Sequence, residues 1–248
     1  MNTSTRTAVL LVAGTGSRLR PLTNDIPKAL VSLGAETILH RMLRQLQQHG
    51  ITRFVFATGY CEQAVRSATA ALAAETVFCR NDDYESTQNS ISLGRCASAL
   101  RGESFVKLDG DLVVEDEILE RVLSDMSAMT VAVDSSRHLD QESMKAEIDA
   151  DGYIRDFGKT MPVARAKAES IGIERLDAAC GEVVLSRIAD LLQRGITNKY
   201  YEDVYAELIG EGLLAPQGLD IAPLAWSEVD TREDLELARA LAASAPGH

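Results

Sequence analysis

The fold of this chain is decided by one stretch: Val9-Leu-Leu-Val-Ala-Gly-Thr-Gly-Ser-Arg-Leu-Arg-Pro-Leu-Thr-Asn-Asp-Ile-Pro-Lys-Ala-Leu-Val31. Its apolar start, residues 8–13, has the length and bulk of a buried β-strand. The strand runs into Gly14-Thr-Gly16, where the backbone can turn sharply and approach a ligand closely. Three fixed cations follow: Arg18, Arg20 and Lys28. Backbone amides beside guanidinium and ammonium groups bind polyphosphates, so the loop predicts a nucleoside triphosphate site.

Two common phosphate loops are excluded by single positions. The dinucleotide fingerprint G-x-G-x-x-G requires a third glycine where the chain has Leu19. A Walker loop requires a glycine five residues before its Gly-Lys-Thr, but Gly158-Lys159-Thr160 is preceded at that distance by Tyr153. The glycine loop is therefore of a third kind.

The bulk composition describes an acidic chain with enough apolar residues for a proper core. Its 248 residues are 46% hydrophobic, and the formal net charge of −12 argues against non-specific nucleic-acid binding. The polar residues 1–6 lead into the first strand, and no apolar run approaches the roughly 20 residues of a membrane span. We therefore expect a cytoplasmic protein with neither a membrane nor a nucleic-acid partner. The cysteines lack the C-x-x-C spacing of zinc and redox sites: Cys61, Cys79, Cys96 and Cys180.

Strands and helices alternate along the first half of the chain, which is typical of a doubly wound, mainly parallel α/β sheet. The patterns predict strands at 53–58, 76–79 and 104–108, with helices at 37–49, 62–74 and 89–100. In the second half they predict strands at 129–133 and 225–229, helices at 181–193, 200–209 and from about Thr231, and a hairpin of 145–148 with 153–157. Asp151-Gly152 would form the two-residue hairpin turn, and the hairpin would be a small antiparallel addition to the sheet.

These patterns predict one domain over residues 1–248. Residues 1–114 would be the nucleotide-binding half and residues 115–248 the acceptor-binding half. Two acidic sites follow predicted strands, Asp109-Gly-Asp111 and Asp230. Ligands of open α/β sheets bind at the carboxyl ends of the strands, and one or two carboxylates usually hold a magnesium ion there. Capping of the next helix is the alternative role for an aspartate in such a place.

The spacing Ala13-Gly-x-Gly-x-Arg18-x-x-Pro21-x-Thr23-x-x-x-Pro27-Lys28 resembles the signature loop of the nucleotidyltransferases that make activated sugars and activated alcohol phosphates. A second segment, with Asn81, Tyr84, Asn89 and Ser92-Leu93, resembles phosphocholine and 2-aminoethylphosphonate cytidylyltransferases. The resemblance implies a Rossmann-like nucleotidyltransferase fold and a Mg²⁺-dependent enzyme. It favours CTP as nucleotide and a small alcohol phosphate or phosphonate, such as phosphocholine or 2-aminoethylphosphonate, as acceptor.

The resemblance also suggests roles for individual residues. Mg²⁺ would be held by Asp111 and Asp230. The catalytic residues would be Arg18, Lys28 and Lys159. Arg18 would hold the leaving pyrophosphate, and Lys28 and Lys159 would position the acceptor, with Lys145 the weaker candidate for holding its phosphate. Tyr201 and Glu202 would contact a cationic head group of the acceptor, although they also fit an amphipathic helix. The nucleotide would be bound by Ala13, Gly14, Thr15, Gly16, Ser17, Arg18, Tyr60, Asn89 and Asp109.

Two other functions stay open at this point. One is transfer to a sugar-1-phosphate or cyclitol phosphate from UTP, GTP, CTP or dTTP, because the glycine loop alone does not select the base. The other is an inactive paralogue that binds a nucleotide and regulates a partner. Such a paralogue would be expected to lack the metal aspartates or the loop arginine, and this chain has Arg18, Lys28, Asp111 and Asp230. The sequence is also compatible with a homo-oligomer.

Overall fold

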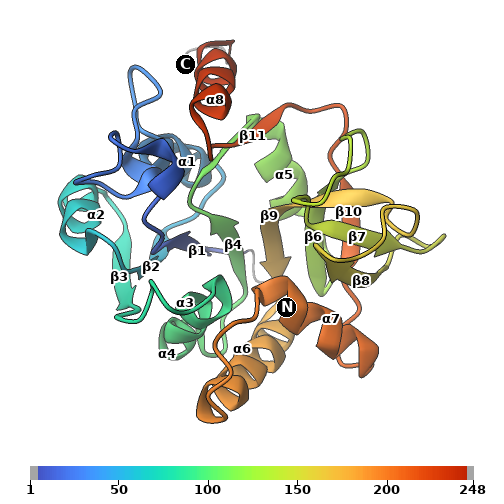
Figure 1. The fold of residues 1–248 in the computed structure, drawn as a ribbon. Helices are drawn as coiled ribbons and strands as arrows, with labels where there is room; N and C mark the ends of the chain where they lie inside the picture. Colours follow the sequence, from blue (N-terminus) through green and yellow to red (C-terminus); the bar gives the residue numbers. More distant parts are fainter. Residues whose placement is uncertain (1–4, 245–248) are drawn as a thin grey trace.

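Within the described part of the chain, a nine-stranded sheet runs through the centre of the molecule (Figure 1). The computed structural model describes residues 5–244, so residues 1–4 of the polar N-terminal stretch lie outside the described part, as do residues 245–248. The strands of this sheet are β1 (Thr7–Val12), β2 (Arg53–Thr58), β3 (Glu75–Arg80), β4 (Phe105–Asp109), β6 (Met129–Asp134), β7 (Lys145–Ile148), β8 (Ile154–Gly158), β9 (Ala168–Leu176) and β10 (Gln217–Asp220). A separate ribbon pairs β5 (Leu112–Val114) with β11 (Trp226–Glu228).

The sheet order is β10-β6-β9-β4-β1-β2-β3, with β7 attached to β9 and β8 attached to β7. Neighbours from β4 to β3 are parallel, and so are β6 and β10. β9 is antiparallel to both β4 and β6, which flank it. The prediction of a mainly parallel, doubly wound sheet with an antiparallel addition is thus confirmed. The carboxyl ends of β1 and β4 lie side by side, since Leu11 pairs with Asp109.

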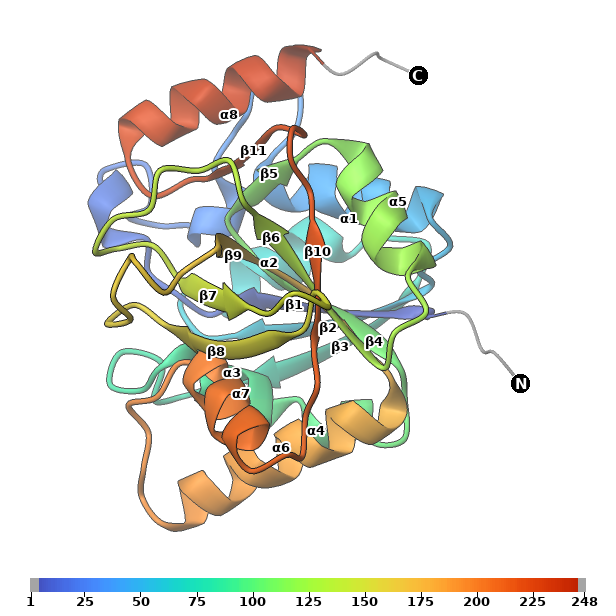
Figure 2. The same cartoon turned by 90° about the vertical axis from the view of Figure 1, so that its right-hand side faces the viewer.

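Helices cover both faces of the sheet, as Figure 2 shows from the side. One face packs against α1 (Ile38–Gln48), α2 (Glu62–Thr69) and α5 (Asp116–Ser124). The other packs against α3 (Asn89–Arg95), α4 (Ala97–Leu100), α6 (Ala178–Gln193) and α7 (Tyr201–Gly210). α8 (Arg232–Ser244) lies over the β5–β11 ribbon. The glycine loop contains one short turn of 3₁₀ helix, η1 (Ser17–Leu19), and a second, η2 (Lys28–Leu30), begins at its last residue.

The longest strand that the sequence patterns missed is β9, in the interior of the sheet. Its sequence, Ala-Glu-Ser-Ile-Gly-Ile-Glu-Arg-Leu, interrupts the apolar run with Glu174 and Arg175. Both side chains are buried, because Glu174 pairs with Lys107 on β4 and Arg175 donates to Thr5 and to the Ser127 carbonyl. An ion pair at Glu174 and hydrogen bonds at Arg175 therefore satisfy, inside the sheet, two side chains that normally mark a surface. The helix α5 and the shorter strands β5 and β10 were also missed.

Three predicted local features are wrong in detail. The helix predicted at 89–100 breaks at Cys96 into α3 and α4, and the helix predicted at 62–74 ends at Thr69, where the Ala70 and Leu72 amides close single turns. The two-residue turn at Asp151-Gly152 is a five-residue loop, 149–153. Asp149 forms it by accepting hydrogen bonds from the amides of residues 151 and 153.

Candidate active site

The glycine loop, residues 13–28, follows β1 and borders a pocket of about 390 Å³, which we call the glycine-loop pocket. Gly16 has a φ of 60°, and a Cβ there would lie 3.0 Å from the Lys28 Cβ, so a glycine suits both the turn and the close packing. Thr23 Oγ1 donates to the Gly16 carbonyl at 2.7 Å. The residues predicted from sequence that line this pocket are Ala13, Gly14, Thr15, Gly16, Ser17, Arg18, Lys28, Asn89, Asp109, Asp111 and Asp230.

Tyr60 is the predicted nucleotide-binding residue that does not line this pocket. Its hydroxyl donates to the carbonyls of Thr23, at 3.1 Å, and of Asn24. Its ring lies 6.3 Å from the ring of Tyr84, which does line the pocket. In this structure Tyr60 holds the tip of the glycine loop, and its contact with a base stays a prediction.

Lys28, Asp111, Glu228 and Asp230 meet at one end of the glycine-loop pocket, and we call these four residues the pocket cluster. Lys28 Nζ lies 2.5 Å from Asp111 Oδ2 and 2.5 Å from Asp230 Oδ1. Arg18, whose side chain is 65% exposed, reaches the other oxygen of Asp230 at 2.6 Å. Burial alone lowers the pKa of Lys28, but the two aspartates outweigh it and raise that pKa above its usual value. The ammonium group is thus a fixed positive charge in this part of the pocket.

The pocket cluster has the donor set of a divalent-cation site. One oxygen from each of Asp111, Glu228 and Asp230 lies within 4.8 Å of the others. Asp111 Oδ1 is buried and, within residues 5–244, accepts no hydrogen bond. An orphaned carboxylate oxygen beside two further carboxylates suits a hard cation such as Mg²⁺. Glu228 was not predicted, although residues 228 and 230 alternate at the end of a strand and so face the same side.

The second sequence segment, residues 81–93, forms the far wall of the glycine-loop pocket. Buried Asn81 donates through Nδ2 to Thr87 Oγ1 at 2.9 Å and to Ser92 Oγ at 3.0 Å, which holds the segment together. Asn89 Oδ1 accepts from the backbone N–H of Tyr201 at 3.0 Å. Asn89 thus borders the pocket while it satisfies an amide at the start of α7.

The residues predicted to bind the acceptor lie in different environments. Lys159 is 38% exposed, with its Nζ 5.3 Å from the centre of the Tyr200 ring. Lys145 is buried and donates to the carbonyls of Asp140 and Ser143, at 2.7 and 3.1 Å. Its ammonium therefore already has partners.

Tyr201 and Glu202 are both buried at the start of α7, in a group of charged residues on the α6–α7 side of the sheet. We call Lys107, Asp109, Glu174 and Glu202 the core cluster. Lys107, with no exposed side-chain surface, lies 2.8 Å from Glu174 Oε2 and 3.2 Å from Asp109 Oδ1, and its Nζ lies 3.5 Å above the Tyr201 ring. Burial raises the pKa of Glu202 to about 8 despite the opposing charge of Lys107. Sequence patterns did not assign Lys107, although a lone lysine in the apolar strand Phe105–Asp109 indicates a buried partner.

A second pocket of about 380 Å³ shares Glu228 and Asp230 with the glycine-loop pocket. The Arg137 guanidinium lies 4.4 Å from the centre of the Trp226 ring and donates to the Trp226 carbonyl at 3.0 Å. Glu169 also lines this space, which we call the Trp226 pocket. Because the two pockets meet at carboxylates of the pocket cluster, molecules bound in both would approach each other there.

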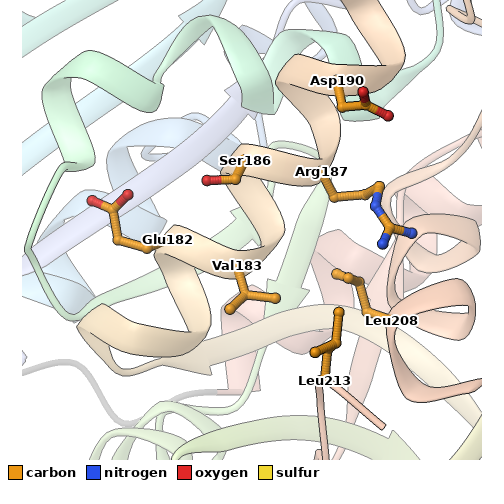
Figure 3. Close-up of a pocket in the computed structure, with 7 residues that line it drawn as sticks. All are labelled: Glu182, Val183, Ser186, Arg187, Asp190, Leu208 and Leu213. Carbon is orange, nitrogen blue, oxygen red and sulfur yellow. The ribbon is translucent and has the colours of Figure 1, made fainter. Parts of the chain in front are cut away.

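A third hollow lies away from these residues, between α6 and α7 (Figure 3). Its floor is mainly apolar, with Val183, Leu208 and Leu213, and Arg187 at its rim pairs with Glu207 and Glu211. It contains none of the predicted site residues.

A protein-family model for the MobA-like NTP transferase domain matches residues 8–194, which include the glycine loop and Asp111. CMP-5'-(3-aminopropyl)phosphonate synthase from Streptomyces rubellomurinus is 30% identical over 236 residues, 92% of this chain but 37% of its own length. CTP:phosphoglutamine cytidylyltransferase from Campylobacter jejuni is 24% identical over 93% of this chain and 98% of its own length. The chain thus spans about a third of the first relative and nearly all of the second.

The inositol-1-phosphate CTP transferase from T. maritima has the same fold, with a TM-score of 0.79 and 21% identity over 100% of both chains. None of the helices in residues 5–244 combines the length and apolarity that a membrane crossing needs. The family match covers most of the chain and includes the loop on which the prediction of nucleotidyl transfer was based. That prediction is confirmed at the level of the family: the chain belongs to the MobA-like NTP transferases.

Proposed function

We propose that the chain is a Mg²⁺-dependent cytidylyltransferase that transfers CMP from CTP to a small alcohol phosphate or phosphonate and releases pyrophosphate. One observation carries the proposal. The glycine-loop pocket brings Arg18, Lys28 and loop amides together with three carboxylates that suit a divalent cation. The names of the Streptomyces and Campylobacter relatives, a CMP-phosphonate synthase and a CTP-dependent cytidylyltransferase, favour the same nucleotide and a similar acceptor.

In this reaction an anionic oxygen of the acceptor attacks the α-phosphorus of CTP in line. A new P–O bond forms, the bond between the α-phosphorus and the bridging oxygen breaks, and pyrophosphate leaves with that electron pair. The attacking oxygen carries no proton, so the reaction requires alignment and charge neutralisation rather than a general base. Mg²⁺, when held by Asp111, Glu228 and Asp230, supplies positive charge beside the reacting phosphate.

The chain's own cations have separate tasks in the proposed reaction. Arg18 and the amides of residues 14–17 bind the leaving pyrophosphate, while Lys28 neutralises charge on the phosphates from its place between Asp111 and Asp230. The acceptor enters through the Trp226 pocket, where Arg137 offers a cation for its phosphate or phosphonate and Glu169 a carboxylate for an amine. Lys159, exposed near Tyr200, assists in binding that phosphate.

The test is pyrophosphate release with Mg²⁺, with CTP, UTP, GTP, ATP and dTTP each combined with phosphocholine, 2-aminoethylphosphonate, and sugar and cyclitol phosphates. Release that requires CTP and an amino-alcohol phosphate or phosphonate supports the proposal. Release with CTP and a sugar or cyclitol phosphate would correct the acceptor, and preference for another nucleotide would overturn the assignment of CTP. Tight nucleotide binding without turnover on any acceptor would instead favour a regulatory protein.

A further inference from the structure

Tyr201 connects two residues of the glycine-loop pocket although it does not itself line that pocket. Its backbone N–H donates to Asn89 Oδ1 at 3.0 Å, and its hydroxyl donates to Asp109 Oδ2 at 2.7 Å. Asn89 and Asp109 both line the pocket, whereas Tyr201 has no exposed surface. One buried residue at the start of α7 thus fixes two polar groups that come from α3 and β4.

The aromatic face of Tyr201 is already covered by a cation. Lys107 Nζ lies 3.5 Å from the ring centre, a distance typical of a cation–π contact. The same ammonium holds Asp109 Oδ1 at 3.2 Å and Glu174 Oε2 at 2.8 Å. Both oxygens of Asp109 are therefore held from inside the core, one by Lys107 and one by Tyr201.

The backbone of β9 leaves room for this arrangement. Gly172 has a φ of 81°, and a Cβ at this position would lie 2.5 Å from Asp109 Oδ2. Any other side chain would therefore collide with the carboxylate that accepts the Tyr201 hydrogen bond. The observed orientation of Asp109 thus depends on side chains or backbone from β4, β9 and α7.

We propose that Tyr201 is a positioning residue for nucleotide binding, acting through Asp109 and Asn89, and that it does not contact the acceptor. The inference rests on the proposed function only for the identity of the nucleotide. A lysine of the chain occupies the place over the ring that a cationic acceptor group would need. α7 belongs to the half of the chain that was predicted to bind the acceptor. In this proposal, however, the first residue of α7 supports the nucleotide side of the site.

The chain contains a matched control for the Tyr201 hydroxyl. Tyr205 lies one turn further along α7, is equally buried, and has its ring centre 5.5 Å from that of Tyr201. Its hydroxyl has no hydrogen-bond partner within residues 5–244. Tyr201→Phe and Tyr205→Phe therefore remove the same atom from the same environment, but only the first breaks a bond to Asp109.

The experiment is calorimetric titration of CTP with Mg²⁺ into wild type and both variants, which needs no acceptor and no turnover. We expect Tyr201→Phe to weaken CTP binding by about 3- to 10-fold, which corresponds to the net contribution of one typical hydrogen bond, because the variant acts on the nucleotide only through Asp109. Tyr205→Phe should stay within about twofold of wild type. Equal affinities for all three proteins, or equal losses in both variants, would overturn the proposal. If wild type binds another nucleotide in place of CTP, the comparison is made with that one, and only the proposed function needs correction.

A double-mutant cycle separates positioning from a general loss of structure. In an Asp109→Asn background the Tyr201 hydroxyl loses its charged acceptor, so Tyr201→Phe should then cost less than about twofold in CTP affinity. An undiminished cost would contradict action through Asp109. Where the wild type turns over, the acceptor KM of Tyr201→Phe should stay within about twofold of wild type. A larger rise with unchanged CTP affinity would assign Tyr201 to the acceptor instead.

Discussion

The pocket cluster and the core cluster contain the same kinds of residues, one lysine among three carboxylates, but differ in exposure. Lys28 and its partners Asp111 and Asp230 have 17–23% of their side-chain surface exposed and border the glycine-loop pocket. In the core cluster Lys107 and Glu174 have none and Glu202 is buried, whereas Asp109, with 27% exposed, connects this cluster to the wall of the glycine-loop pocket. Charges at the pocket can exchange partners with a ligand, whereas buried charges keep each other in place. Access to solvent, more than residue type, therefore separates a binding group from a supporting one.

The largest effect is expected from Asp111→Asn in the pocket cluster. Losing a charged ligand of the proposed cation site should reduce the rate of pyrophosphate release by about 1,000-fold. Mn²⁺ binding, followed by electron paramagnetic resonance in the presence of CTP, should weaken in parallel. Asp151→Asn, on an exposed loop, is the matched control and should behave as wild type. Unchanged metal binding in the Asp111 variant would remove it from the cation site.

Lys28→Met should give the next largest effect: it should lower turnover and raise the affinity for Mn²⁺. Turnover should fall by about 30- to 100-fold, because a cation that neutralises phosphate charge is lost. In the absence of nucleotide, Mn²⁺ should bind about tenfold more tightly, since the ammonium no longer occupies the space between Asp111 and Asp230. Lys167→Met, at an exposed position, should change neither quantity. Weaker Mn²⁺ binding in the Lys28 variant would show that the lysine does not compete with the metal.

The sequence predicts best those parts of the fold in which an apolar strand is followed directly by glycine or aspartate residues. β1 and β4 are apolar, and the loop and the Asp-Gly-Asp turn follow them directly, so the pocket could be placed at their carboxyl ends. β9 was not predicted because Glu174 gains its ion pair, and Arg175 its buried hydrogen bonds, only in the folded chain. Tertiary pairing there overrides the local pattern.

The core cluster was beyond sequence reasoning for a related reason. The hydrogen bond between Tyr201 and Asp109 joins residues that are 92 positions apart, and no periodicity reports such a contact. An aromatic residue beside an acid at residues 201–202 suggested an acceptor site, since nothing in the pattern showed that Lys107 lies over the ring. Which residues would line a common pocket was therefore easier to predict than what each one contacts.

A smaller effect is expected from Lys159→Met, which tests the acceptor side of the comparison. Lys159 is partly exposed, and its ammonium lies 4.0 Å from Glu142 Oε2. The loss of one solvent-exposed contact to phosphate should raise the acceptor KM by about 5- to 10-fold and leave the CTP KM unchanged. Steady-state kinetics with one substrate varied at a time measures both, with Lys167→Met as control. A selective rise in the CTP KM would place Lys159 on the nucleotide side.

Glu202→Gln should have the smallest effect, and it tests whether the core cluster is strained by its excess of carboxylates. Burial raises the pKa of Glu202 to about 8 and that of Glu174 to about 7, against an ordinary value of 4.5, although Lys107 opposes both shifts. Between 4.5 and these values the folded chain binds more protons at these carboxyls than the unfolded chain does. The free energy of unfolding therefore falls as the pH rises through this window.

Glutamine at position 202 is neutral at every pH. The free energy of unfolding of the variant should therefore fall less steeply with rising pH than that of wild type. We expect it to be on the order of 1 kcal/mol more stable than wild type at pH 8.5 and no more stable at pH 4.5. Thermal unfolding at both pH values measures the difference, which corresponds to a few degrees in Tm. Glu233→Gln, an exposed substitution on α8, should retain the pH dependence of the free energy of unfolding seen in wild type. If the Glu202 variant also kept this pH dependence, Glu202 would be ionised without cost in the fold. The core cluster would then resemble the pocket cluster.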